Sequence, residues 1–335
     1  MPPPRLPPVL EGRASQRVLG VVCGLVGLGS VVPLLAWVYG LGAFAAWFWG
    51  LAAPGLAFVA ITGVALRRSG RYPTLLVALV SGAVGGLAAT VAYDLVRGPF
   101  VALGYQLFAP VSSYGILILG AAHSSHLTET LGWLYNFANG IGFGVAYATI
   151  GLGRRWWWAI PFALALETTT VLTPYADIYG LRNHPDVIAI AYGAHVFYGV
   201  ALGLIVERAA GWSASRDTLP PVSWALVATV VLIALWQQPW VVTAEPAPIA
   251  GRPAVVVSGG RFQPAWSRIP LGGCVVLDNR DASAYRLSLP AGAAPLPGHA
   301  RRSYCFASAG VKRVQLNRVP YSGGWVLVDP ALGPS

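Results

Sequence analysis

Long apolar spans, interrupted by short arginine-bearing loops, fill the chain as far as about Val242. With 56% hydrophobic and only 10% charged residues among 335, and a mean hydropathy of +0.61, the chain has more apolar surface than one soluble core can bury. After Val242 the pattern changes to short alternating segments separated by proline and glycine. We therefore predict an integral membrane protein with a water-facing C-terminal part.

Seven stretches are long and apolar enough to be transmembrane helices, because about 20 apolar residues are needed to cross the hydrocarbon core. They are residues 17–39, 42–66, 73–97, 130–152, 156–175, 188–208 and 222–242. A further apolar stretch, 98–122, is interrupted by Pro99, Pro110 and the Ser112–Ser113 pair, which disfavours a regular spanning helix. We predict an α-helical membrane bundle of seven spans, with 98–122 re-entrant or lying at the membrane surface.

The arginines indicate the orientation, because cytoplasmic loops are enriched in Lys and Arg. Seven spans and a cytoplasmic N-terminus place on the cytoplasmic side Arg13, Arg17, Arg67, Arg68, Arg71, Arg154, Arg155, Arg208 and Arg216. Eight spans would move Arg154 and Arg155 outside and the C-terminal part inside. The sequence thus predicts a multi-pass protein of a prokaryotic cytoplasmic membrane.

Four regions follow from this orientation. They are a flexible cytoplasmic tail (1–16), a transmembrane helical domain (17–243), a linker (244–253) and an extracytoplasmic domain (254–335). The formal net charge of +10 does not indicate nucleic-acid binding, since the arginines occur singly or in pairs at the ends of spans. The partners we expect are the lipid bilayer and a membrane or extracytoplasmic protein.

Polar residues within the spans end stripes of small residues at four-residue spacing. The stripes are Gly82, Gly86, Thr90 and Asp94; then Asn136, Gly140 and Gly144; then His195, Gly199 and Gly203. Small residues let helices approach closely, so the stripes should face other helices and not lipid. Six polar residues form a candidate ligand-binding set: Asp94, Asn136, Asn139, Glu167, His195 and Tyr198.

Two interpretations of this set remain open. Such groups can be interhelical hydrogen-bond partners, each contributing about 0.6 kcal/mol on average. A buried carboxylate such as Glu167 and an imidazole such as His195 can instead bind a divalent metal, relay a proton or hold a small polar solute.

A second candidate site lies in the outer loops. His123, His126 and Glu129 are spaced at i, i+3 and i+6, and His184 occurs in a loop on the same side. Metal sites usually need three or four ligands, so these residues form a composite candidate site for copper or zinc.

The sequence gives little support for an enzyme. It contains no Ser-His-Asp order, nucleotide-binding glycine loop or zincin motif. A haem-binding oxidoreductase would need two histidines within the membrane, and only His195 is found there. We therefore lean towards a protein that is not an enzyme.

The C-terminal part reads as short strands of a small β-sandwich. It resembles the cupredoxin family in Phe262-x-Pro264, in the run Gly273–Asp281, in Pro297-Gly298, in the strand at Phe306 and in the closing run Gly324–Val328. This resemblance covers roughly the last 80 residues and implies an all-β cupredoxin-like fold. It also implies that Cys274 and Cys305 lie on facing or neighbouring strands and form a disulfide in an oxidising compartment.

The copper ligands of that family are not retained. Where the resemblance implies a histidine ligand four residues after Asp281, this chain has Tyr285, and between Val311 and Val328 there is no cysteine, histidine or methionine. We therefore expect no blue copper here, since such a site needs two imidazoles and a thiolate.

Two functions from different classes are consistent with this pattern. In the first, the helical bundle binds a metal ion or small polar solute at its outer face, and the copper-free sandwich caps it. In the second, the protein is an accessory or scaffold subunit whose sandwich binds a partner outside the membrane.

Overall fold

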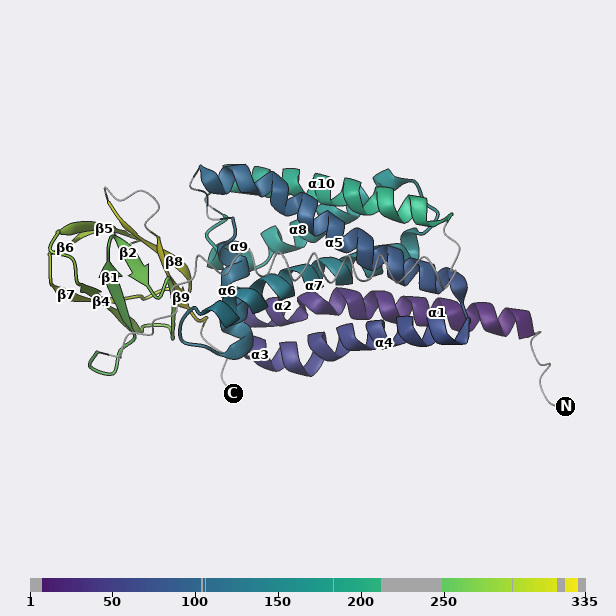
Figure 1. The fold of residues 1–335 in the computed structure, drawn as a ribbon, viewed down its shortest axis with the longest axis horizontal. Helices are drawn as coiled ribbons and strands as arrows, with labels where there is room; N and C mark the ends of the chain where they lie inside the picture. The colour runs from purple at the N-terminus through teal and green to yellow at the C-terminus, as the bar shows by residue number, and fades with distance from the viewer. Residues whose placement is uncertain are drawn as a thin grey trace.

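The fold is that of a helical bundle with a β-sandwich at one end, as the computed structural model of the chain shows (Figure 1). The structure describes residues 8–103, 105, 107–182, 184–211, 249–290, 292–317 and 323–330. The helices run along the long axis of the molecule, and the sandwich lies at the end remote from the N-terminus.

The helical part consists of long helices with short helical segments between them. In chain order these are α1 (Pro8–Leu28), η1 (Gly29–Val31), α2 (Val32–Val38), α3 (Phe44–Trp47), η2 (Phe48–Ala52), α4 (Ala53–Ser69), α5 (Pro73–Ala102), α6 (Ala109–Leu119), α7 (His126–Gly151), η3 (Trp156–Trp158), α8 (Ala159–Leu172), α9 (Tyr175–Ile178) and α10 (Pro185–Ala209). Proline stands at the first positions of α5 and α10, where its missing N–H costs nothing.

Within the described residues, four helical segments are long and apolar enough to cross a membrane. They are Ala14–Val38, Phe44–Ser69, Pro73–Ala102 and Pro185–Ala209, and they correspond to four of the seven predicted spans. The predicted span 130–152 falls on α7, which is long but carries several polar residues. The predicted span 156–175 falls on α8, which has 14 residues and ends before Thr173 and Pro174, since proline disfavours helix at the preceding residue. The predicted span 222–242 lies outside the described residues.

Two helices extend beyond the predicted spans. Helix α1 begins at Pro8, well before residue 17, so helix replaces part of the expected flexible tail. Helix α5 continues through Pro99 to Ala102, and the stretch 98–122 therefore contains the end of α5 and the 11-residue α6. At about 1.5 Å per residue, α6 is too short to cross a bilayer.

The small-residue stripes are close helix contacts, as predicted. A Cβ added to Gly86 of α5 would meet the carbonyl group of Gly140 on α7, and one added to Gly82 would lie 2.7 Å from the oxygen of Gly144. On α10, a Cβ at Gly199 would lie 2.6 Å from the Cα of Ile160. These glycines therefore allow backbone-to-backbone packing between helices.

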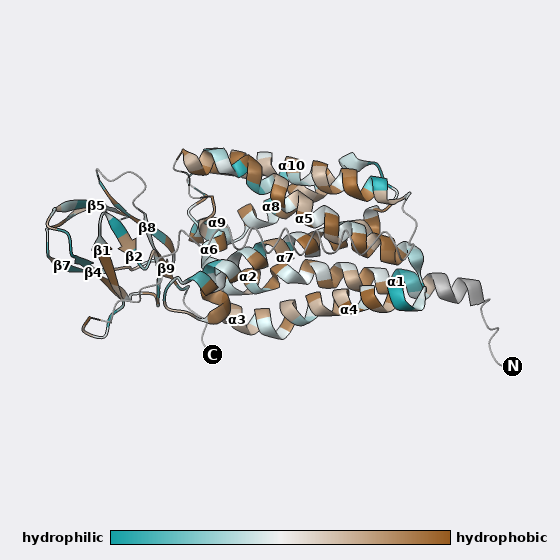
Figure 2. Ribbon diagram, in the orientation of Figure 1, coloured by the Kyte–Doolittle hydropathy of each residue, from teal (hydrophilic) through white to brown (hydrophobic). Residues whose placement is uncertain are grey.

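Hydrophobic residues are distributed along the whole length of the helices of the bundle (Figure 2). Leu25, Ile61 and Val64 are among the large hydrophobic side chains that remain exposed there. The turns that follow α4 and α7 carry Arg71, Arg154 and Arg155 and lie at the end of the bundle opposite the sandwich (Figure 1). The apolar surface and this charged end fit a bilayer environment.

The C-terminal part forms two sheets. Its strands are β1 (Ala254–Ser258), β2 (Arg261–Gln263), β3 (Trp266–Ile269), β4 (Cys274–Asn279), β5 (Tyr285–Leu289), β6 (Gly292–Leu296), β7 (Arg301–Cys305), β8 (Gly310–Leu316) and β9 (Gly324–Val328). One sheet has the order β2-β1-β4-β7 and the other β3-β9-β8-β5-β6. Val257, Val275, Leu287, Leu316 and Val328 are among the buried residues of the core between them.

The sandwich is joined to the bundle by main-chain pairing. The loop before α7 runs antiparallel to β3: Arg268 N–H donates to Ala122 O at 2.7 Å, and Ser124 N–H donates to Trp266 O at 2.9 Å. Trp266 and Leu327 pack in the same buried cluster as residues of α2, α6 and α7. The pairing covers the edge of β3 and fixes the sandwich over the end of the bundle.

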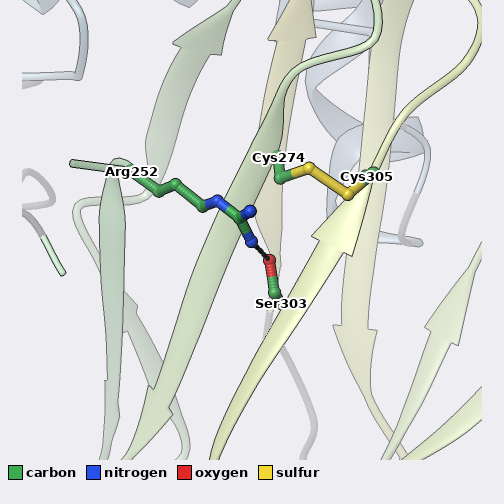
Figure 3. The surroundings of a disulfide bond; sticks show 4 residues. All are labelled: Arg252, Cys274, Ser303 and Cys305. Atoms are coloured by element: carbon green, nitrogen blue, oxygen red, sulfur yellow. Dashed lines mark hydrogen bonds between the residues drawn. A yellow bond between two sulfur atoms is a disulfide. The ribbon is translucent and has the colours of Figure 1, made fainter. Parts of the chain in front are cut away.

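The predicted disulfide is confirmed (Figure 3). Cys274 on β4 lies directly opposite Cys305 on the antiparallel strand β7. Beside it, the guanidinium of Arg252 donates to the hydroxyl of Ser303 at 2.9 Å. The disulfide therefore ties the outermost strand of its sheet to the neighbouring strand.

Candidate functional site

A cavity of about 840 Å³ lies within the helical bundle and extends to the sandwich. Its wall is built from α1, η1, α2, α5, α6, α7, α8, α9, α10 and β8. It extends to His184 and Asp186, which are exposed at the start of α10. The cavity is therefore a space within the molecule that has contact with its surface.

Five of the six predicted ligand-binding residues line this cavity: Asn136, Asn139, Glu167, His195 and Tyr198. The sixth, Asp94, lies behind the wall and forms an ion pair with Arg97, which does line the cavity. The amide of Asn136 reaches Asp94 at 3.4 Å. The structure thus brings together residues from α5, α7, α8 and α10 that the sequence separates by as many as 104 positions, from Asp94 to Tyr198.

Glu167 and His195, the predicted pair, are neighbours in the structure. The Oε2 atom of Glu167 lies 3.3 Å from Nδ1 of His195, and both side chains are largely buried. Thr170 donates a hydrogen bond to the same Oε2 at 3.1 Å, while Nδ1 of His195 lies 2.9 Å from the carbonyl oxygen of Ala191. A single Nδ1–H donates most favourably to the carbonyl, which leaves Glu167 able to interact with other groups in the cavity.

Arg97 is a site residue that the sequence analysis missed. Its guanidinium is held by Asp94 at 3.2 Å and lies over the rings of Tyr93 and Phe108, at 4.6 Å and 4.8 Å from their centroids. Only 8% of its side chain is exposed, so it is one of the few buried charges of the described residues. The signal was present in the sequence, because Tyr93, Asp94 and Arg97 are spaced to share one region of a helix surface.

Tyrosines form a second group on the wall, of which the sequence had predicted only Tyr198. Tyr93, Tyr114, Tyr175, Tyr179 and Tyr198 line the cavity. The hydroxyl of Tyr179 lies 2.6 Å from that of Ser113, and Tyr198 donates to the carbonyl oxygen of Gly140 at 3.0 Å. Their rings give the wall an apolar surface with polar groups at fixed places.

Asn139 also presents an unsatisfied group to this region. Its Oδ1 is buried and accepts no hydrogen bond within the described part of the chain. Because an unsatisfied buried polar group costs about 1–3 kcal/mol, a hydrogen-bond donor in the cavity would be stabilising at this position.

The predicted metal ligands do not converge. His123 pairs through its backbone with Ser267 of the sandwich, and His126 is the first residue of α7. Glu129 accepts a hydrogen bond from Ser112 at 3.0 Å, and His184 lies on the wall of the cavity. Among the described residues, no group of three or more His, Cys, Asp or Glu side chains is placed to hold a metal ion.

The sandwich contributes to the cavity through β8. Val311 and Arg313 line the wall, whereas Val314 and Leu316 of the same strand belong to the core of the sandwich. The alternation of a β-strand thus directs Arg313 toward the bundle. The sequence shows the alternation but not which face of the sheet meets the helices, so Arg313 was missed.

Tyr285, which stands where the cupredoxin resemblance implies a histidine ligand, makes a hydrogen bond within the sandwich. The hydroxyl of Tyr285 donates to Oδ2 of Asp281 at 2.8 Å, and the backbone N–H groups of Gly259 and Gly260 donate to the same carboxylate at 2.8 Å and 3.1 Å. The Gly259 hydrogen bond is the largest cause that lowers the pKa of Asp281. These contacts join loops of the sandwich, and the residues present do not fit a blue-copper centre.

Comparison with known proteins gives a likeness of fold only. No family model matches the chain, and no curated protein matches it. Among solved structures, a purple cupredoxin from Nitrosopumilus maritimus is similar, with 19% identity over 23% of this chain and 98% of its own chain and a TM-score of 0.21. An oxidised mutant of amicyanin is also similar, with 19% identity over 24% of this chain and 85% of its own and a TM-score of 0.22. The predicted resemblance to the cupredoxins is confirmed.

Proposed function

We propose that this protein binds a small polar solute in the cavity of its helical bundle, beneath the sandwich. One observation carries this proposal: Arg97, Asn136, Asn139, Glu167 and His195, which come from four helices, all line the same cavity. Polar and ionisable groups inside a membrane are costly, and they usually face a substrate pathway or one another. A wall that is mostly apolar with a few converging polar groups is typical of a small-molecule site.

A solute fits these residues better than a metal ion does. The carboxylate of Glu167 has one neighbouring imidazole, and no further carboxylate or thiolate joins them among the described residues. Metal sites need three or four ligands in a fixed geometry. The cavity instead offers separated donors and acceptors, which suits an organic molecule with several polar groups.

We further propose that the site faces the extracytoplasmic side of a prokaryotic cytoplasmic membrane. Arginine-bearing turns gather at the end opposite the sandwich, as expected for the cytoplasmic end. The Cys274–Cys305 disulfide supports an oxidising compartment for the sandwich. In this proposal residues 17–243 span the membrane seven times, 244–253 connect the two parts, and 254–335 cap the cavity.

The experiment compares two tryptophan variants of α10. Ala191 lines the cavity, whereas Ala189 is exposed two residues earlier on the same helix. Ala191→Trp therefore fills the cavity, and Ala189→Trp adds the same side chain outside it. The purified full chain in nanodiscs is screened by thermal unfolding against short-chain organic acids, amines, amino acids and sugars.

We expect at least one class of solute to raise the unfolding temperature of the wild type and of Ala189→Trp, but not of Ala191→Trp. Binding of a solute to the native state alone raises stability by mass action. A shift that persists in Ala191→Trp, or the absence of any shift in the wild type, would contradict the proposal. If the protein is instead an accessory subunit whose polar residues only join helices, no solute should raise the unfolding temperature of the wild type.

A further inference from the structure

Arg313 is the group that the sandwich contributes to the cavity. It follows Val311 by two residues on β8, and both line the cavity wall. Trp325 is its partner on β9, the next strand of the same sheet. Because residues 310–314 of β8 pair with β9, the position of Arg313 is fixed by the sheet and not by a loop.

The guanidinium of Arg313 is incompletely satisfied. Its Nε is buried and donates no hydrogen bond within the part of the chain that the structure describes. Burial lowers the pKa of Arg313, and no carboxylate of the described residues counteracts that effect. A buried donor without an acceptor costs about 1–3 kcal/mol, and more when the group is charged.

The other charged groups of the wall have partners or are exposed, whereas Arg313 is half-buried. Arg97 is neutralised by Asp94 at 3.2 Å. Glu167 accepts a hydrogen bond from Thr170 and lies beside His195. Asp186 is exposed at the start of α10. Arg313 therefore differs from them, since it is a cation whose buried donor has no acceptor.

We propose that Arg313 recognises an oxyanion, so that the solute is a small organic anion bridging the sandwich and the bundle. A planar guanidinium binds carboxylate and phosphate groups through parallel N–H donors. The charged end of the solute lies against β8, and its body lies along the apolar wall that includes Leu34, Leu107 and Phe143. This inference rests on the proposed function and names the class of its ligand.

The test uses three probes of similar shape: benzoate, phenyl phosphate and the uncharged benzamide. Binding to the full chain in nanodiscs is measured by calorimetry for the wild type, Arg313→Gln and Arg313→Lys. Arg302→Gln is the matched control, because Arg302 is an exposed arginine of β7 on the same domain.

We expect one of the two anions to bind the wild type at least about tenfold more tightly than benzamide, which corresponds to about 1.4 kcal/mol. Arg313→Gln should remove this preference, Arg313→Lys should retain part of it, and Arg302→Gln should leave it unchanged. The two anions distinguish a carboxylate from a phosphate ligand. A preference for anions that survives in Arg313→Gln would overturn the inference.

Two further results separate this inference from the proposed function. If benzamide and the anions bind equally well and Ala191→Trp abolishes all binding, the cavity binds solutes but Arg313 does not select them. If none of the three probes binds the wild type, both proposals fail for this class of molecule.

A stability measurement distinguishes ligand recognition by Arg313 from a purely structural role of this residue. Without ligand, Arg313→Leu should be at least as stable as the wild type, because it removes a buried donor that lacks an acceptor. A lower unfolding temperature for Arg313→Leu than for the wild type would overturn the inference.

Discussion

Removal of the Cys274–Cys305 disulfide should destabilise the sandwich by a calculable amount. The two cysteines are separated by 31 positions, for which the chain-entropy model gives about 3.7 kcal/mol at 25 °C. The effect should be largest at β7, because this strand lies at the end of its sheet and pairs only with β4 among the described strands. A loss of about 3.7 kcal/mol corresponds to roughly a 500-fold increase in the population of molecules in which the sandwich is unfolded.

Hydrogen exchange read by mass spectrometry measures this population directly. Peptides covering 301–305 should exchange faster in the Cys274→Ser/Cys305→Ser double variant, by up to about 500-fold when exchange occurs through global opening. Reduction of the wild-type protein should have the same effect. Cys23→Ser is the control, since Cys23 is a buried free cysteine of α1. Unchanged exchange in the double variant would refute the reasoning, as would an equal effect of Cys23→Ser.

Two further variants test the packing of α5 and the loops of the sandwich. Gly86→Ala should lower the stability of the full chain by about 1–3 kcal/mol in thermal unfolding, because its Cβ would meet the Gly140 carbonyl. Gly98→Ala, on the same helix, places its Cβ in open space and should not lower the stability. Equal stabilities of the two alanine variants would contradict the packing account. The pKa of Asp281 is lower in the folded protein than in the unfolded chain, where it is about 4. The ionised carboxylate therefore stabilises the fold above that unfolded-state pKa, and this stabilisation is lost as the pH falls through the folded-state pKa. Asp281→Asn should therefore be less stable than wild type at pH 7 and approach it below about pH 4, as pH-dependent denaturation would show; a constant difference at all pH values would argue against this origin.

The sequence predicted the polar residues of the site because burying them in a membrane is costly. Glu167 and His195 stand in apolar helices, and such residues need partners, which made their approach to one another foreseeable. The glycine stripes likewise indicated which helix faces meet. Asp94 was also identified, but its role is to hold Arg97 and not to line the cavity.

Other parts of the site depend on tertiary arrangement, which local patterns do not encode. Arg97 stands at the end of a predicted span, where an arginine is usually an interfacial residue, yet α5 continues past it and buries it. The alternation of β8 predicts that Arg313 points away from the core of the sandwich. Only the docking of β3 onto the loop before α7 shows that this outer face of the sheet meets the bundle. The spacing of His123, His126 and Glu129 suggested a shared site, but Glu129 pairs with Ser112 of α6.

The proposed function requires above all that the cavity be open to solutes from the outer side of the membrane. Asn136 of α7 lines the cavity, whereas Ala148 is fully buried near the other end of the same helix. Each is replaced by cysteine in a Cys23→Ser background, and intact cells are treated with a small membrane-impermeant thiol reagent. We predict that Asn136→Cys is labelled in intact cells, that adding Ala191→Trp slows this labelling, and that Ala148→Cys is not labelled. Labelling of Asn136→Cys only after the cells are permeabilised, or no labelling at all, would contradict the central claim.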